Sequence, residues 1–178
     1  MMKSQDILIL LKLVSLHQCA SVQPEAFSVR ALAASTGISK TEVNASLKRS
    51  IEVGLAKLDR GSQLPKANTK VLLDFIVSGL RYVFPAKLGA IERGVVTGFE
   101  APGLEGLLSS VGEYLYIWPD ASGSEKGQSV PPLYKTAPFA AKQDPKLYQS
   151  MALVDAIRLG DPREVAIAKQ ALTERLRP

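Results

Sequence analysis

The strongest constraint on the fold is in residues 28–54, where the signals for two helices are separated by a turn of only a few residues. Ser28 is suited to cap the first helix, because its hydroxyl can accept a hydrogen bond from a backbone amide of the first turn. Gly37 follows Thr36 and is the residue type that most often ends a helix in a left-handed conformation. The sequence therefore predicts a short helix from Ser28 to Thr36 and a tight turn at Gly37.

A second helix signal follows this turn directly. Ser39 and Glu42 have the spacing of a capping box, in which each side chain accepts a hydrogen bond from the other residue's backbone amide. Gly54 marks the end of the helix, which we expect to occupy about residues 39–53. Its apolar positions recur every four residues and predict one stripe that faces the core, made by Val43, Leu47 and Ile51.

The spacing of small and apolar residues in these two helices is that of a helix-turn-helix unit. Ala33 is small enough for the helices to cross closely, and Gly37, four residues later, allows a positive φ in the turn. Val43 lies six residues further on, and we expect it to fill the angle between the helices together with Ile38 and Leu47. We therefore predict a helix-turn-helix between residues 28 and 54.

A candidate β-hairpin follows the second helix. Leu55 to Asp59 alternates in part like an edge strand, and Arg60-Gly61-Ser62 is a turn signal. The return strand is marked less clearly, because Pro65 cannot donate a hydrogen bond to a neighbouring strand.

Residues 4–66 as a whole resemble the winged helix-turn-helix domain of bacterial transcriptional regulators such as the MarR and IclR families. The resemblance is carried by two segments, Ser39-Lys40-Thr41-Glu42-Val43-Asn44-Ala45-Ser46-Leu47-Lys48-Arg49 and Gly54-Leu55-Ala56-Lys57. It implies that the helix at about residues 39–53 is a recognition helix, which lies in the major groove of duplex DNA, and that the hairpin is the wing.

The distribution of charge agrees with this implication. The chain has a formal net charge of +5. Residues 28–70 contain eight basic and three acidic side chains, so this segment carries the whole excess. A basic patch confined to one segment is expected of a protein that binds a polyanion.

In the helix at about residues 39–53, successive side chains are rotated by about 100° around the helix axis, and this geometry assigns roles to them. It separates the apolar stripe from Thr41 and Lys48, which we expect to face DNA. Asn44 is suited to pair with the edge of an adenine, and Ala45 and Thr41 to contact a thymine methyl group. Basic side chains of the helix and of the hairpin are expected to contact phosphates. The predicted DNA-binding residues are Ser39, Lys40, Thr41, Asn44, Ala45, Lys48, Arg49, Lys57 and Arg60.

The first helix signal begins at Ser4 and runs to about Gln18. Residues 7–16 are apolar around almost the whole circumference of this helix, so the rest of the domain or a second subunit must cover it on more than one side. Operators of winged-helix proteins commonly consist of paired half-sites. On these two grounds we expect a homodimer.

The rest of the chain predicts further helices and a little β-structure. A helix is expected at about residues 69–81, then a connector rich in Gly and Pro at 82–112 with irregular structure and short extended pieces. Tyr114 to Trp118 is the best strand candidate, and a polar loop is expected at 119–132. Asp144-Pro145 and Asp161-Pro162 have the pattern of helix starts and predict an antiparallel pair at about 145–159 and 162–176.

These elements predict a mainly α fold with a small β component. It would comprise a winged helix-turn-helix domain at residues 1–81, the connector at 82–112, and a C-terminal α+β region at 113–178 that ends in the helical pair.

Several other classes of function are disfavoured. His17 and Cys19 are the only residues of their types, so an intramolecular disulfide and a zinc cluster are not expected. A phosphate-binding loop of the Walker type is also missing from the sequence. We therefore expect neither an enzyme nor a protein that requires a cofactor or metal. Residues 7–16 fall short of the roughly 20 apolar residues of a membrane span, and no cleavable signal pattern accompanies them, which predicts a cytoplasmic protein.

The resemblance and the charge pattern together predict a sequence-specific regulator of transcription, a repressor or autoregulator. One alternative is a protein-binding module of the antitoxin type that neutralises a partner, because residues 81–85 and 152–158 faintly resemble segments of uncharacterised bacterial proteins, some of which act as antitoxins. Another is a sensor with a small-molecule pocket between the domains.

Overall fold

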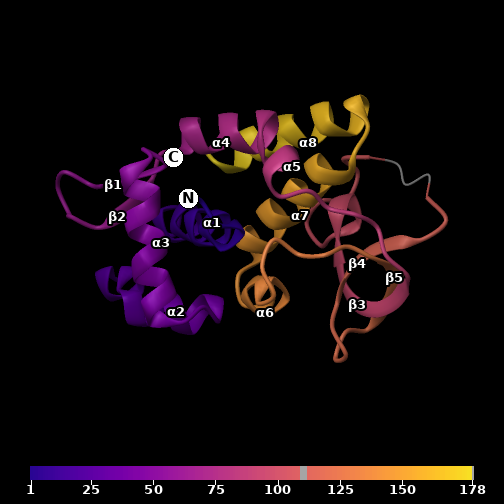
Figure 1. Cartoon of the computed structure of the whole chain (residues 1–178), viewed down its shortest axis with the longest axis horizontal. Helices are drawn as coiled ribbons and strands as arrows, with labels where there is room; N and C mark the ends of the chain where they lie inside the picture. The colour runs from indigo at the N-terminus through magenta and orange to yellow at the C-terminus, as the bar shows by residue number, and fades with distance from the viewer. Residues whose placement is uncertain (109–111, 178) are drawn as a thin grey trace.

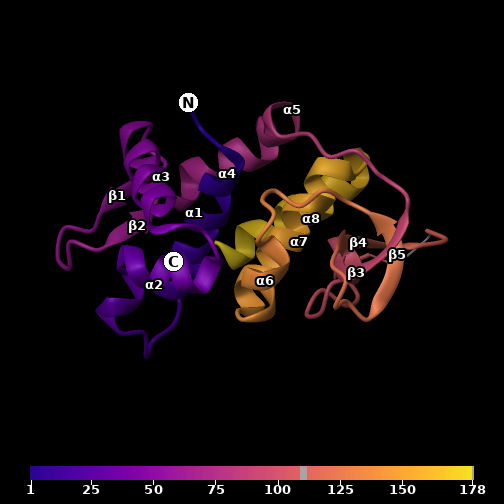
Figure 2. The same ribbon diagram turned by 60° about the horizontal axis from the view of Figure 1, so that its bottom comes forward.

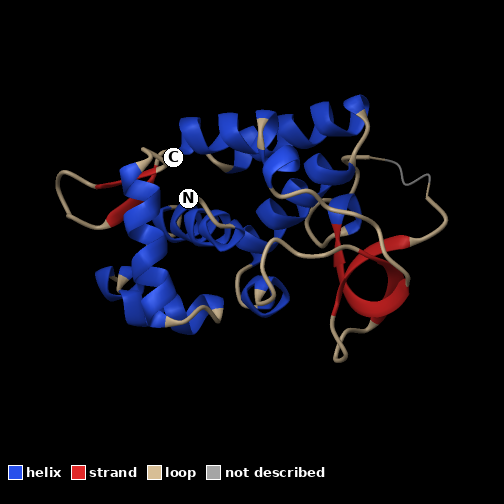
Figure 3. Ribbon diagram, viewed as in Figure 1, coloured by secondary structure: helices blue, strands red, loops and turns tan. Residues whose placement is uncertain are grey.

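The computed structural model describes residues 1–108 and 112–177. The protein is mainly helical with a small β component, as predicted (Figures 1 and 3). The helices are α1 Ser4–His17, α2 Val29–Thr36, α3 Lys40–Glu52, α4 Thr69–Ser78, α5 Leu80–Val83, α6 Ala137–Lys142, α7 Pro145–Leu159 and α8 Pro162–Arg175, with short 3-10 helices η1 Pro24–Phe27 and η2 Gly98–Glu100. The strands are β1 Ala56–Leu58, β2 Pro65–Ala67, β3 Ile91–Thr97, β4 Leu115–Pro119 and β5 Glu125–Ser129.

Helix α1 lies at the centre of the molecule, and its residues 6–15 are all buried. It contacts α2, α3 and β2 on one side and α7 on the other (Figure 1). The same chain therefore covers the apolar circumference that the sequence shows. This removes one of the two grounds for expecting a homodimer, because α1 needs no second subunit to bury it.

A buried ion pair joins α1 to α7. Lys12 Nζ lies 2.9 Å from Asp144 Oδ2, and the Ser15 hydroxyl donates to the same carboxylate at 2.7 Å. Burial raises the pKa of Asp144, but the hydrogen bonds from Ser15, the Leu147 amide and Lys12 outweigh that effect, so the pKa is lowered. Asp144 thus remains ionised and fixes the start of α7 against α1. The N-terminal and C-terminal segments share one hydrophobic core, to which both helices contribute.

The two helices of the C-terminal pair, α7 and α8, begin where the sequence predicts. Asp144 accepts a hydrogen bond from the Leu147 amide at 3.1 Å and caps α7. Asp161 accepts one from the Glu164 amide at 2.9 Å, and Glu164 Oε2 accepts from the Asp161 amide at 3.2 Å, which completes a capping box at α8. The predicted helix at 69–81 is interrupted at Gly79, which separates α4 from α5.

A small closed barrel is formed by β3, β4 and β5, at the end of the molecule opposite α2 and α3 (Figure 3). Strand β3 is antiparallel to both of the others, while β4 and β5 are parallel. Gly94 belongs to both antiparallel ladders, and a Cβ there would lie 2.0 Å from the carbonyl oxygen of Trp118. Such close approach of backbones explains the glycine at this position.

The prediction of a polar loop at 119–132 is wrong for residues 125–129, which form β5. The strand has polar side chains at four of its five positions, so it lacks the apolar alternation that marks a half-buried strand. Residues 125–129 are extended because they pair with β3 and β4, and the local sequence does not indicate this pairing.

A buried polar cluster fastens the barrel to α7. Asp155 accepts hydrogen bonds from the Thr97 hydroxyl at 2.7 Å and from Trp118 Nε1 at 2.6 Å, and it pairs with Arg158 at 2.8 Å. Arg158 also donates to the carbonyl oxygens of Phe84, Pro85 and Pro131. Burial raises the pKa of Asp155, and the charge of Arg158 opposes that shift. Both oxygens of the Asp155 carboxylate therefore accept hydrogen bonds that stabilise the fold.

Candidate nucleic-acid interface

Helices α2 and α3 form the predicted helix-turn-helix geometry. Gly37 has φ 73° and its amide donates to the Ala33 carbonyl at 2.9 Å, which ends α2 in the left-handed conformation. Ser39 accepts a hydrogen bond from the Glu42 amide at 3.2 Å and caps α3. Ile38 and Val43 are buried where the two helices meet. The local signals in the sequence thus placed the turn and the start of both helices correctly.

The solvent-facing side of α3 carries a row of polar and basic side chains. Lys40, Thr41, Asn44 and Lys48 are all exposed, and they lie within about a third of a turn of one another by helical geometry. Ala45 is half-buried at the edge of this row. We call Lys40, Thr41, Asn44 and Lys48 the α3 outer face.

The inner side of α3 differs from the predicted apolar stripe. Val43 is buried and Leu47 is partly buried, but Ile51 is 40% exposed, so the stripe is wrong at its last position. Ser46 and Ser50 are buried instead. Helical geometry groups Ser50 with the inner side of α3, whereas the burial of Ser46 does not follow from the spacing of the apolar residues.

Arg49 does not belong to the α3 outer face, contrary to the prediction. Its Nε and Nη2 donate to the two carboxylate oxygens of Asp6 at 3.0 and 2.7 Å, and Nη2 also contacts Glu42. Asp6 is fully buried in α1. The hydrogen bond to Asp6 raises the pKa of the Arg49 guanidinium, which stays charged. Arg49 therefore links α3 to α1 inside the protein. The sequence feature that points to this role is Asp6, an acidic residue at the start of an apolar run, which needs a charged partner when it is buried.

Glu42 takes part in the same cluster, and the predicted capping box is only half formed. Its backbone amide bonds to Ser39, but its carboxylate pairs with Arg49 and accepts from Gln5 at 3.0 Å. The hydrogen bond from Arg49 lowers the pKa of Glu42 below its usual range. The acidic charge of Glu42 is therefore neutralised locally, and it opposes the basic side chains nearby less than its formal charge suggests.

The hairpin after α3 is formed as predicted, and Pro65 is accommodated at its edge. Strands β1 and β2 are antiparallel, with Leu58 opposite Pro65. Asp59 shapes the turn by accepting hydrogen bonds from the Gly61 and Ser62 amides at 3.1 and 3.0 Å. These bonds from Ser62 and Gly61 lower the pKa of Asp59. The hairpin thus presents a turn of defined shape.

Two of the predicted basic contacts lie on this hairpin. Lys57 and Arg60 are exposed. Among the described residues, neither they nor Lys40 and Lys48 form an ion pair within the protein. Six of the nine predicted residues are therefore exposed on α3 and the hairpin: Lys40, Thr41, Asn44, Lys48, Lys57 and Arg60. Of the other three, Ser39 caps α3, Ala45 is half-buried at the edge of the outer face, and Arg49 points inward to Asp6.

The C-terminal half leaves the α3 outer face uncovered. Helix α3 packs on α1, α2 and β1. Together with the hairpin it lies at the end of the molecule opposite the barrel, as two views show (Figures 1 and 2). Helix α6, which the sequence did not predict, packs against α2 instead. Its Phe139 Cδ1 lies 3.1 Å from the position that a Cβ would occupy on Gly37, so this glycine also permits close packing between the two halves.

The described residues contain neither a candidate metal centre nor a candidate membrane span. No group of three or more His, Cys, Asp or Glu side chains there is arranged to hold a metal ion. No helix of that part of the chain combines the length and the apolar character needed to cross a bilayer. Comparisons with protein-family models, with curated proteins and with solved structures found no match.

Proposed function

We propose that this protein binds duplex DNA through α3 and the hairpin β1–β2, and that it regulates transcription as a repressor or autoregulator. The observation that carries the proposal is the α3 outer face, where Lys40 and Lys48 flank Asn44 and Thr41 on the solvent-exposed side of the helix. An α-helix fits the major groove of B-DNA, which is about 12 Å wide. The proposed role would also require a location in the cytoplasm, as the sequence predicts.

The exposed side chains divide into two groups by chemistry. Asn44 and Thr41 are short and polar, as is suitable for contact with base edges, and Asn44 can bond both polar atoms of an adenine edge. Lys40 and Lys48 on α3, with Lys57 and Arg60 on the hairpin, are suited to phosphates, which position a protein without reading sequence. A dimer would place two copies of α3 on paired half-sites.

Replacing Lys40 and Lys48 by Ala is expected to weaken binding to duplex DNA and to reduce its dependence on salt. Each lost phosphate contact lowers the magnitude of the slope of log affinity against log salt concentration by about 0.9. The double variant should therefore lose about 1.8 from the slope. Fluorescence anisotropy of a labelled duplex, selected by the protein from a random-sequence pool, measures both quantities over a series of salt concentrations.

The matched control removes two exposed lysines from the opposite half of the protein, Lys126 of β5 and Lys169 of α8. It has the same net charge as the test variant, so the affinity should change far less and the slope should stay near that of the unmodified protein. Equal losses in both variants would mean that only net charge attracts DNA. If neither variant differed from the parent protein, the proposed surface would be wrong.

A further inference from the structure

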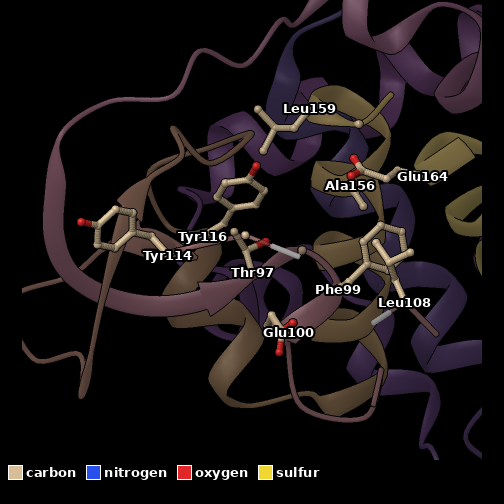
Figure 4. Close-up of a pocket in the computed structure, with 12 residues that line it drawn as sticks. Thr97, Phe99, Glu100, Leu108, Tyr114, Tyr116, Ala156, Leu159 and Glu164 are labelled. Carbon is tan, nitrogen blue, oxygen red and sulfur yellow. The ribbon is translucent and has the colours of Figure 1, made fainter. Parts of the chain in front are cut away.

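A cavity of about 300 Å³ lies in the C-terminal half, between the barrel and the helices α7 and α8 (Figure 4). It is distinct from the α3 outer face and is built by different elements. Its volume is at the lower end of the range for small-molecule sites. The lining residues that matter for its chemistry are Phe99, Glu100, Tyr116, Leu159 and Glu164.

The walls of this cavity are mostly apolar and aromatic. Phe99 and Tyr116 are half-buried, and Leu159 also lines the cavity (Figure 4). Thr97 also lines the cavity, but its hydroxyl is already committed to Asp155. The apolar and aromatic side chains of the walls therefore offer contact surface to the apolar body of a ligand.

The charged groups of the cavity are all acidic. Glu100 and Glu164 line it, whereas Lys and Arg are missing from its described lining. Neither carboxylate forms an ion pair with a described residue. An anion would thus meet two carboxylates and no cationic side chain in the described lining.

Glu164 is held in place by the fold. Its Oε2 accepts the hydrogen bond from the Asp161 amide at the start of α8. Its Oε1 accepts no hydrogen bond from the described residues, so this oxygen retains its capacity for a ligand. A carboxylate whose position is fixed in advance loses little conformational freedom when it binds a cation.

We propose that this cavity binds a small organic cation, a protonated amine or quaternary ammonium group on an apolar or aromatic body. The cationic group would lie near Glu164, whose carboxylate attracts positive charge, and an aromatic wall of the cavity would add to this attraction. The apolar body would pack against Phe99 and Leu159. This inference is independent of DNA binding.

Isothermal titration calorimetry with 2-phenylethylammonium tests the proposal directly. Its neutral counterpart 2-phenylethanol has nearly the same shape but lacks the charge. We expect saturable binding of the amine in the millimolar range or tighter, and binding of the alcohol at least about tenfold weaker, a difference of about 1.4 kcal/mol. Glu100→Gln with Glu164→Gln should weaken binding of the amine by at least about the same factor.

The double substitution keeps the shape of both side chains, and Gln is also accepted at the third position of a capping box, so α8 should remain intact. Glu92→Gln, on the exposed start of β3 and outside the cavity lining, is the control and should bind the amine as the parent protein does. Thermal melts followed by circular dichroism establish that each variant is folded. The proposal is overturned if the amine does not bind, if the alcohol binds equally well, or if the double variant and the control behave alike.

Discussion

Asp155→Ala is expected to lower the free energy of unfolding by about 3–5 kcal/mol, because it leaves a buried guanidinium without its charged partner. The side chains of Asp155 and Arg158 are 2% and 3% exposed, so water cannot replace the lost interaction. The substitution also removes the acceptor for Thr97 and for Trp118. Urea denaturation followed by circular dichroism gives the free energy and the slope with denaturant.

The matched control is Asp120→Ala, which breaks an ion pair with Lys142 at the surface. The two side chains of this pair are 22% and 44% exposed, and surface pairs contribute at most about 1 kcal/mol. A loss for Asp155→Ala as small as the loss for Asp120→Ala would show that the cluster does not hold the barrel on α7.

Arg49→Ala is expected to cost a similar amount, about 3–5 kcal/mol, because it leaves the carboxylate of Asp6 buried and unpaired. Asp6 is fully buried, and both of its oxygens accept from Arg49. The neighbouring substitution Lys48→Ala removes the same charge from an exposed site, where the expected change is within about 0.5 kcal/mol. We therefore expect Arg49→Ala to lower mainly the stability of the protein, and Lys48→Ala to lower mainly its affinity for DNA.

The comparison uses urea denaturation for stability and anisotropy with the selected duplex for binding. Lys48→Ala should weaken binding while leaving the midpoint of unfolding almost unchanged, and Arg49→Ala should move the midpoint strongly. If Arg49→Ala left the midpoint in place and weakened binding as much as Lys48→Ala, Arg49 would belong to the DNA contact after all.

The parts of the fold that the sequence predicted correctly are those encoded by residues close together in the chain. Gly37 ends α2, and Asp144 and Asp161 cap α7 and α8, because each of these interactions spans only a few residues. The helix-turn-helix geometry and the hairpin followed from such signals. For the same reason the exposed positions of Lys40, Asn44 and Lys48 could be deduced from helical periodicity.

The errors involve partners that are distant in sequence. Arg49 was assigned to the outer face because its partner Asp6 lies 43 residues away, and helical geometry alone cannot show where a long side chain turns. Strand β5 was missed because its order comes from β3 and β4. The sequence suggests a small-molecule pocket only in general terms and does not identify the residues of the cavity lined by Tyr116 and Glu164, because these come together only where the barrel meets α7 and α8.

Binding of DNA by α3 is tested most directly by the reactivity of individual lysines toward an acetylating reagent, measured by mass spectrometry with and without the selected duplex. We expect DNA to slow acetylation of Lys40, Lys48 and Lys57 strongly, while Lys126 and Lys169 react at the same rate in both conditions. Unchanged reactivity of Lys40 and Lys48 in the presence of saturating duplex would contradict the assignment of α3 as the helix that contacts DNA.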